Sequence, residues 1–138
     1  MILRLAIVAV VAGGVAAAFW VGKRIVLNRS RAATEREGWG GVDFSAHRVT
    51  AVLFTGPNCA QCEVQRASIA QIRRERSDVG YAEFNAGIEV ELAKRLKILS
   101  VPTTVVVDAS GMVVARNGRL VDGSVLQRQI GAALATTT

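Results

Sequence analysis

The apolar segment Val49–Thr55 constrains the fold of this chain more than any other part of the sequence. It is rich in β-branched residues and almost continuously apolar, which is typical of a strand that is covered on both faces. Gly56 and Pro57 end this strand, and Asn58 is a favoured N-cap residue for a helix that begins near position 59. A buried strand that leads directly into a helix predicts an α/β domain.

The region after this strand alternates between helical and extended patterns. A first helix is expected over residues 59–76, with its apolar side chains inward and its arginines outward. The inward residues are Val64, Ala67, Ile69 and Ile72, and the outward ones are Arg66, Arg73 and Arg74. The elements expected after it are a strand over 81–85, a helix over 89–97, strands over 103–108 and 112–116, and a helix over 123–134. This β-α-β-α-β-β-α order predicts a parallel core, to which the closing hairpin adds an antiparallel edge.

The N-terminal region carries a second strong signal, because residues 5–22 contain no charged side chain. As a helix this segment spans about 27 Å, close to the thickness of the hydrocarbon core of a bilayer. Phe19 and Trp20 suit an interfacial aromatic belt, and two cations follow them. We therefore predict one N-terminal transmembrane helix within an anchor over residues 1–27. A cleaved signal peptide is the alternative, since the alanines at 16–18 resemble a cleavage site.

The flanking charges predict the orientation of this helix. Only Arg4 and the terminal amine precede it, whereas the cations that follow it are Lys23, Arg24, Arg29 and Arg31. The positive-inside rule then places the C-terminal domain in the cytoplasm, and an extracytoplasmic domain remains the alternative because the difference is small. Residues 28–47 mix charges with glycines without periodicity, so we expect a juxtamembrane linker there and a domain over residues 48–138.

The charge of the chain does not point to nucleic acid. The formal net charge is +6 over 138 residues, of which +4 lies in residues 1–41, beside the apolar segment, and +2 in residues 42–138. A nearly balanced domain without a stripe of basic and aromatic residues is a poor nucleic-acid binder.

Cys59 and Cys62 are the only cysteines, and their C-x-x-C spacing places both on the first turn of the expected helix. A disulfide between them closes too small a loop to restrict the unfolded chain appreciably. A structural zinc site needs four ligands, and besides the two cysteines only His47 can supply a thiolate or imidazole ligand. A structural zinc site within the chain is therefore not expected. At a helix N-terminus the pKa of the Cys59 thiol is expected to fall from about 8.5 toward about 3.5–7.5. Cys59 is therefore the expected nucleophile of disulfide exchange, and Cys62 the resolving thiol.

Several motifs resemble the thioredoxin family over about residues 48–136. The matching residues are Phe54, Cys59-Ala60-Gln61-Cys62, Asn85, Val101-Pro102-Thr103, the turn over 108–111 and Gly118. The resemblance implies a thioredoxin-like fold, with three α/β/α layers and a mixed central sheet. It also implies a cis peptide bond before Pro102, in a loop that faces the cysteines and leaves the Val101 backbone free to pair with a substrate. Val101, Pro102 and Thr103 are thus the candidate substrate-binding residues.

Departures from the family pattern lie at the site itself. Asn58, Ala60 and Gln61 replace the residues usual around the two cysteines, and we expect them to tune the redox potential. Leu53 occupies the position of the family's buried aspartate, and Glu83 that of its lysine partner. Glu83 is a candidate proton relay with a pKa raised by burial, and a solvated strand residue is the alternative. The shortened region before position 48 resembles short actinobacterial thioredoxin-like proteins.

These features predict a membrane-tethered thiol–disulfide oxidoreductase with a role in cell redox homeostasis. Its redox-active centre is the Cys59–Cys62 pair, and no cofactor or metal is expected. The expected partners are a disulfide-containing protein or a small thiol, an upstream reductase or other dithiol donor, and the membrane. The alternatives are an exported oxidoreductase or sulfur carrier, and a redox-inactive thioredoxin-like module that binds partners through the Val101 loop.

Overall fold

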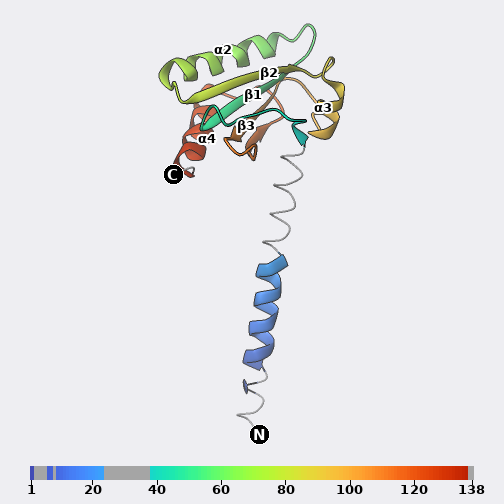
Figure 1. Ribbon diagram of the computed structural model, residues 1–138, viewed down its shortest axis with the longest axis vertical. Coiled ribbons are helices and arrows are strands. Elements are labelled where there is room, and N and C mark those ends of the chain that lie inside the picture. The colour runs from blue at the N-terminus through green and yellow to red at the C-terminus, as the bar shows by residue number, and fades with distance from the viewer. Residues whose placement is uncertain (2–5, 8, 24–37, 137–138) are drawn as a thin grey trace. The chain divides into compact units, whose positions relative to one another are not determined.

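The computed structural model describes residues 1, 6–7, 9–23 and 38–136. The chain divides into two compact units, residues 1–34 and 35–138. Residues 9–23 of the first unit form a helix (Figure 1). Within the described part of the chain, no helix reaches the length and hydropathy that crossing a bilayer requires. The predicted anchor also includes residues that lie outside the described part, and it stays a prediction.

The second unit has the predicted β-α-β-α-β-β-α order, which is thereby confirmed. Its elements are β1 (Val49–Thr55), α2 (Ala60–Glu75), β2 (Val79–Asn85), α3 (Val90–Arg95), β3 (Thr103–Asp108), β4 (Val113–Asn117) and α4 (Gly123–Thr136), and they can be followed in Figure 1. The expected bounds hold for β1 and β3, and the other elements differ by a few residues at their ends.

β2 begins earlier than expected because Gly80 is a strand residue rather than part of a break. It pairs with Thr50 in the parallel β1–β2 ladder. A Cβ on Gly80 would lie 2.5 Å from His47 Cδ2 and 2.7 Å from Thr50 Oγ1. The glycine therefore marks a close approach of neighbouring side chains to the strand, which a sequence pattern cannot distinguish from a turn.

The four strands form one mixed sheet in the order β2-β1-β3-β4. β1 is parallel to β2 but antiparallel to β3, and β3 is antiparallel to β4. The mixed sheet that the resemblance implies is confirmed, whereas the parallel core expected from the element order is wrong beyond the β1–β2 pair. β3 is buried at five of its six positions, and a strand that is buried on both faces shows no sequence pattern that indicates its direction.

Helices cover both faces of the sheet, which confirms the three-layer arrangement. Val49, Ala51 and Leu53 of β1 pack in one core cluster with side chains of α2 and α4. Val52 and Phe54 pack in a second cluster with side chains of α3 and β3. This division follows from the alternation of side chains along a strand, and it explains why β1 is apolar at nearly every position.

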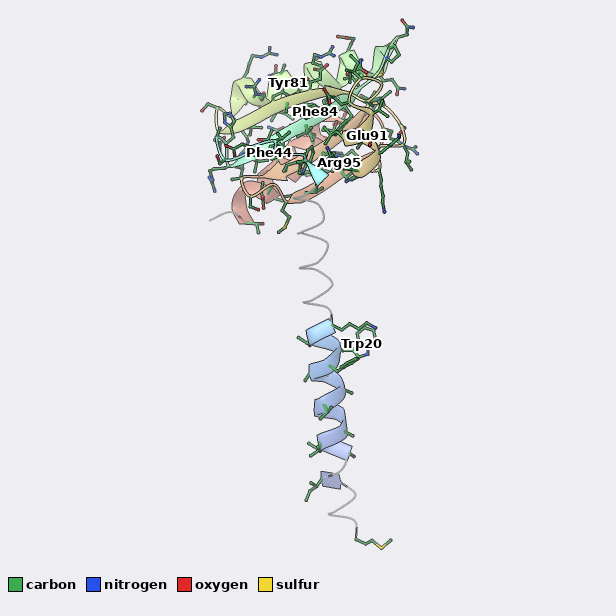
Figure 2. The ribbon with its side chains drawn as sticks, turned by 45° about the vertical axis from the view of Figure 1, so that its right-hand side comes forward. Trp20, Phe44, Tyr81, Phe84, Glu91 and Arg95 are labelled. Atoms are coloured by element: carbon green, nitrogen blue, oxygen red, sulfur yellow. A yellow bond between two sulfur atoms is a disulfide. The ribbon has the colours of Figure 1, made fainter. Side chains whose placement is uncertain are left out.

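The segment just before β1 contributes two aromatic side chains to the second cluster. Trp39 is 2% exposed and Phe44 5% exposed, although both lie in the range expected to form a linker. The ring of Trp39 lies 5.0 Å from that of Phe44 and 6.3 Å from that of Phe54, centroid to centroid. Phe44 and Phe84, which stacks on Phe54, are labelled in Figure 2. Residues 38–47 therefore pack against the sheet.

The buried face of α2 is partly different from the expected one. Ile69 and Ile72 are buried as predicted, but Val64 is 54% exposed and Ala67 is also exposed. Gln65 is buried instead, because its amide pairs with the backbone of Val121 in both directions. A polar side chain is thus the buried residue at this turn, where apolar periodicity cannot identify it.

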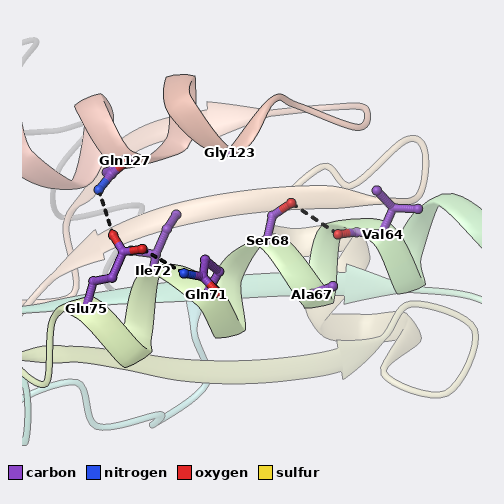
Figure 3. Close-up of a pocket in the computed structure, with 8 residues that line it drawn as sticks. All are labelled: Val64, Ala67, Ser68, Gln71, Ile72, Glu75, Gly123 and Gln127. Carbon is purple, nitrogen blue, oxygen red and sulfur yellow. Dashed lines mark hydrogen bonds between the residues drawn. The ribbon is translucent and has the colours of Figure 1, made fainter.

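Val64 and Ala67 line a groove of about 390 Å³ between α2 and α4. Figure 3 shows Gln127 of α4 donating a hydrogen bond to Glu75 of α2 at one end of this groove. The groove is lined by neither cysteine, so it is separate from the candidate site.

Candidate active site

Cys59 and Cys62 form a disulfide, with their Cα atoms 5.2 Å apart. Cys59 is the N-cap residue of α2, and its Sγ accepts a hydrogen bond from the backbone N–H of Cys62 at 3.2 Å. Cys62 is buried, at 2% exposed, whereas Cys59 is partly exposed. The more accessible cysteine therefore lies at the N-terminus of a long helix, where the helix dipole favours a negative charge.

The turn into α2 differs from the expected one. Asn58 was expected to cap the helix, but Cys59 occupies the cap position, so this prediction is wrong. Asn58 instead has a φ of 53°, in the left-handed region that asparagine adopts more readily than most residues. Ala60 and Gln61 are exposed on the first helical turn. The three candidate redox-tuning residues thus surround the disulfide at the surface.

A pocket of about 510 Å³ lies beside the disulfide. It is formed by the end of β1, the turn into α2, the first turns of α2 and the end of β2. Both cysteines line it, and its polar side chains include Asn58, Glu63, Arg66, Glu83 and Asn85. The structure therefore brings Glu83, a residue far away in the sequence, to the same pocket as the cysteines.

The peptide bond between Val101 and Pro102 is cis, which confirms what the resemblance implies. Pro102 and Thr103 are buried, and the Thr103 hydroxyl donates a hydrogen bond to the Ser100 carbonyl at 2.6 Å. A Cβ on Gly56 would lie 3.0 Å from Val101 Cγ2. Because Gly56 lines the pocket of the disulfide, this close approach places the Val101 loop next to the turn that carries the cysteines.

Glu83 forms an ion pair with Arg66, which the sequence analysis did not predict. Arg66 of α2 donates to both carboxylate oxygens of Glu83, at 2.9 Å from Nε and 2.6 Å from Nη2. The Tyr81 hydroxyl donates to the same carboxylate. The hydrogen bond from Arg66 lowers the pKa of Glu83, with a smaller contribution from Tyr81, and these outweigh burial. The expected rise of this pKa is therefore wrong.

Leu53, the residue at the position of the family's aspartate, faces Glu83 directly in the β1–β2 register. Its side chain is fully buried in the first core cluster. A carboxylate that stays ionised beside this apolar residue is a poor proton donor near neutral pH. The arrangement does not favour the proton relay for which Glu83 was a candidate.

The sequence analysis missed two interactions of this site, namely the ion pair between Arg66 and Glu83 and the hydrogen bond from Tyr81 to Glu83. From the sequence, Arg66 is expected to face outward and to offset the carboxylate of Glu63 beside Cys62; it lines the pocket and pairs with Glu63, Nη1 to Oε2 at 2.5 Å. Its position four residues after Cys62 on one helix was the available signal, because such residues share a helix face. Tyr81, labelled in Figure 2, had no distinguishing signal in the sequence.

No group of three or more histidine, cysteine, aspartate and glutamate side chains is placed to hold a metal ion among the residues that the structure describes. The redox group of the site is the disulfide itself.

The fold and the site together define a class of protein. It has a mixed four-stranded sheet between helices, a C-x-x-C disulfide at the start of a helix, and a cis-proline at the start of a neighbouring strand. No protein-family model matches the chain. No curated protein matches it either.

Solved structures of thioredoxins do match. A mutant thioredoxin from Halobacterium salinarum is 23% identical, with a TM-score of 0.59 over 65% of this chain and 78% of that one. Thioredoxin-2 of the malaria parasite is 18% identical, with a TM-score of 0.57 over 61% and 82%. Oxidized mitochondrial thioredoxin 3 from Saccharomyces cerevisiae is 15% identical, with a TM-score of 0.57 over 64% and 82%. At these identities the likeness shows the fold, and the predicted thioredoxin-like fold is confirmed.

Proposed function

We propose that this protein is a thiol–disulfide oxidoreductase whose redox-active group is the Cys59–Cys62 pair. The observation that supports this most is the disulfide at the start of α2, with a partly exposed Cys59 and a buried Cys62. An attacking thiol has to be reached by its substrate, whereas a resolving thiol has only to reach its neighbour. The partial exposure of Cys59 suits an attacking thiol, and the burial of Cys62 suits a resolving thiol.

The exchange proceeds in two steps. The thiolate of reduced Cys59 attacks one sulfur of a substrate disulfide, so that a Cys59–substrate disulfide forms and the other substrate sulfur leaves as a thiolate. The thiolate of Cys62 then attacks Cys59 Sγ, closes the intramolecular disulfide and releases the second substrate sulfur. The two thiol protons of the enzyme pass through solvent to the two product thiolates. The substrate disulfide is reduced, the dithiol is oxidised, and no cofactor takes part.

The loop at Val101, Pro102 and Thr103 is the proposed binding surface for the substrate. It lies next to the turn before Cys59, as the close approach of Val101 to Gly56 indicates. The substrate is a protein disulfide or a small-molecule disulfide, and an upstream reductase or other dithiol donor returns the pair to its reduced form. Asn58, Ala60 and Gln61 are proposed to tune the redox potential, since their side chains surround the disulfide.

We further propose that the N-terminal segment tethers this domain to a membrane and that the domain faces the cytoplasm. The uncharged residues 5–22 and the cations that follow them support this assignment. In the cytoplasm the dithiol is kept reduced, so the protein acts as a reductant. On the opposite side it serves as an exported oxidoreductase.

The substitution Cys62→Ser tests the exchange mechanism. Without the resolving thiol, the mixed disulfide on Cys59 cannot be released intramolecularly, so substrates accumulate on the protein. We expect covalent adducts on non-reducing gels that disappear with dithiothreitol, and none with the matched control Cys59→Ser/Cys62→Ser. The absence of covalent adducts on Cys62→Ser would contradict the disulfide-exchange mechanism. Retained non-covalent binding that depends on Val101 would then favour the redox-inactive binding module.

A further inference from the structure

Arg66 is the only cation among the described residues that line the pocket beside the disulfide. Its guanidinium lies between two carboxylates, 2.5 Å from Glu63 Oε2 and 2.6 Å from Glu83 Oε1. The ion pair to Glu83 joins α2 to β2 through two parallel hydrogen bonds, from Nε and Nη2. Such bidentate pairs hold both partners in one geometry. The three side chains therefore form a charge cluster beside both cysteines.

The ion pair holds Arg66 and Glu83 in their charged forms. The hydrogen bond to Glu83, followed by that to Glu63, raises the pKa of Arg66, and Arg66 in turn lowers the pKa of Glu83. Tyr81 stays neutral, because burial and its hydrogen bond to Glu83 raise the pKa of its hydroxyl. The charged side chains that line the pocket with the cysteines are two carboxylates and one guanidinium, in addition to the partial positive charge of the α2 N-terminus.

If Arg66 were absent, the carboxylate of Glu83 would disfavour a cysteine thiolate more strongly than that of Glu63. Its side chain is 29% exposed, against 72% for Glu63, so water screens Glu83 less. A like charge in a partly buried pocket disfavours a thiolate, and an adjacent guanidinium cancels that effect. Arg66 reaches this position because it lies four residues after Cys62, on the same face of α2.

We propose that Arg66 is a positioning residue for disulfide exchange, which holds Glu83 and Glu63 in ion pairs and so prevents their carboxylates from opposing the thiolate of reduced Cys59. This inference rests on the proposed function, because it concerns the reactivity of the same thiol. The ion pair joins α2 to β2 at the strand position that is paired with the buried Leu53.

The pH dependence of Cys59 alkylation in the full chain measures this effect directly. In a Cys62→Ser background, iodoacetamide reacts with one thiol, and the rate against pH reports the pKa of that thiol. Arg66→Gln leaves both carboxylates unpaired, so we expect the midpoint to rise by at least half a unit. The alkylation rate below the midpoint then falls about threefold or more, since one pKa unit is a factor of ten. Glu83→Gln leaves Arg66 less neutralised, and we expect a shift in the opposite direction.

Arg74→Gln is the matched control for the loss of one arginine from α2. Arg74 contacts Gln71 and lies fourteen positions after Ala60, or about 21 Å along the helix axis, beyond a Debye length of about 10 Å. We expect no shift for this variant. An unchanged midpoint in Arg66→Gln, or an equal shift in Arg74→Gln, would overturn the inference.

Two further measurements separate the possible failures. If Arg66→Gln loses its circular dichroism spectrum, the opposite shift of Glu83→Gln still decides the question, and its absence contradicts the inference. Reduction of a protein disulfide such as insulin is measured on the same preparations with both cysteines present. Shifted alkylation profiles without any reduction by the parent protein would contradict the proposed function alone. Reduction with unshifted profiles would contradict only the role of Arg66.

Discussion

The carboxylate of Glu83 accepts hydrogen bonds from Arg66 and Tyr81, and these keep its pKa below the ordinary value of 4.5. A group whose pKa is lower in the folded state stabilises that state when it is ionised. The stabilisation is complete above the ordinary pKa, and it is lost as the pH falls through the lower pKa of the folded protein. Acidification therefore weakens the link between α2 and β2 that Glu83 provides.

The substitution Glu83→Gln is expected to make the domain less sensitive to acid. The free energy of unfolding, measured with urea, should differ more between parent and variant at pH 7 than at pH 3, because the stabilisation by the ionised carboxylate is complete above about 4.5 and declines as the pH falls below it. The same substitution at the exposed Glu89 controls for the loss of a surface charge. An equal difference at both pH values would contradict the stabilising ion pair.

At the same scale, Asn58 and Cys59 show what a local pattern misses. Asparagine is a common N-cap, so placing the cap at Asn58 was reasonable. The chain instead enters α2 through a left-handed Asn58, and the Cys59 sulfur takes the cap position. One residue of displacement puts Cys59 itself, rather than its neighbour, at the helix terminus. Backbone conformations that several residue types adopt cannot be assigned from residue type alone.

Among the elements, the segment before β1 differs most from its prediction. Its glycines and mixed charges are typical of a linker. Trp39 and Phe44 nevertheless pack in the second core cluster, against the apolar side chains of Phe54, Leu92 and Leu96. A short segment without periodicity can bury two aromatic rings only where a complementary surface exists, and that surface is assembled from residues distant in sequence.

The two tryptophans of the chain offer a matched test of this packing. Trp39→Ala is expected to lower the free energy of unfolding by about 3–5 kcal/mol, the usual cost of removing a buried aromatic side chain. Trp20→Ala is the control, because Trp20, labelled in Figure 2, belongs to the first compact unit and is 72% exposed. Urea unfolding followed by circular dichroism measures both. A loss below about 1 kcal/mol for Trp39→Ala would show that residues 38–47 act as a linker.

On the scale of the whole molecule, the two compact units carry separate predictions. Residues 35–138 contain the sheet, its helices and the disulfide. Residues 1–34 contain the uncharged stretch on which the proposed membrane tether depends. The tether and the redox chemistry can thus be tested independently of each other.

The full chain is expected in the membrane fraction after carbonate extraction, and residues 35–138 expressed alone are expected in the supernatant. An uncharged stretch of this length inserts stably, whereas a domain without it has no anchor. A membrane-impermeant thiol reagent applied to intact cells should leave reduced Cys59 unlabelled. Labelling from outside would place the domain on the opposite side, and extraction of the full chain would contradict the tether. A shortened N-terminus by mass spectrometry would favour the cleaved signal peptide.

The sequence alone determined the order of the elements, the thiol pair at the start of a helix and, by resemblance, the cis-proline loop. Each depends on neighbouring residues: apolar periodicity, the C-x-x-C spacing, and Pro102 at the start of an apolar strand. Only the tertiary structure decided the direction of β3, the burial of Trp39 and the pairing of Arg66 with Glu83. These depend on which surfaces meet in the folded chain. The pKa of Glu83 is lowered, and not raised as predicted, because Arg66 of another element donates hydrogen bonds to its carboxylate.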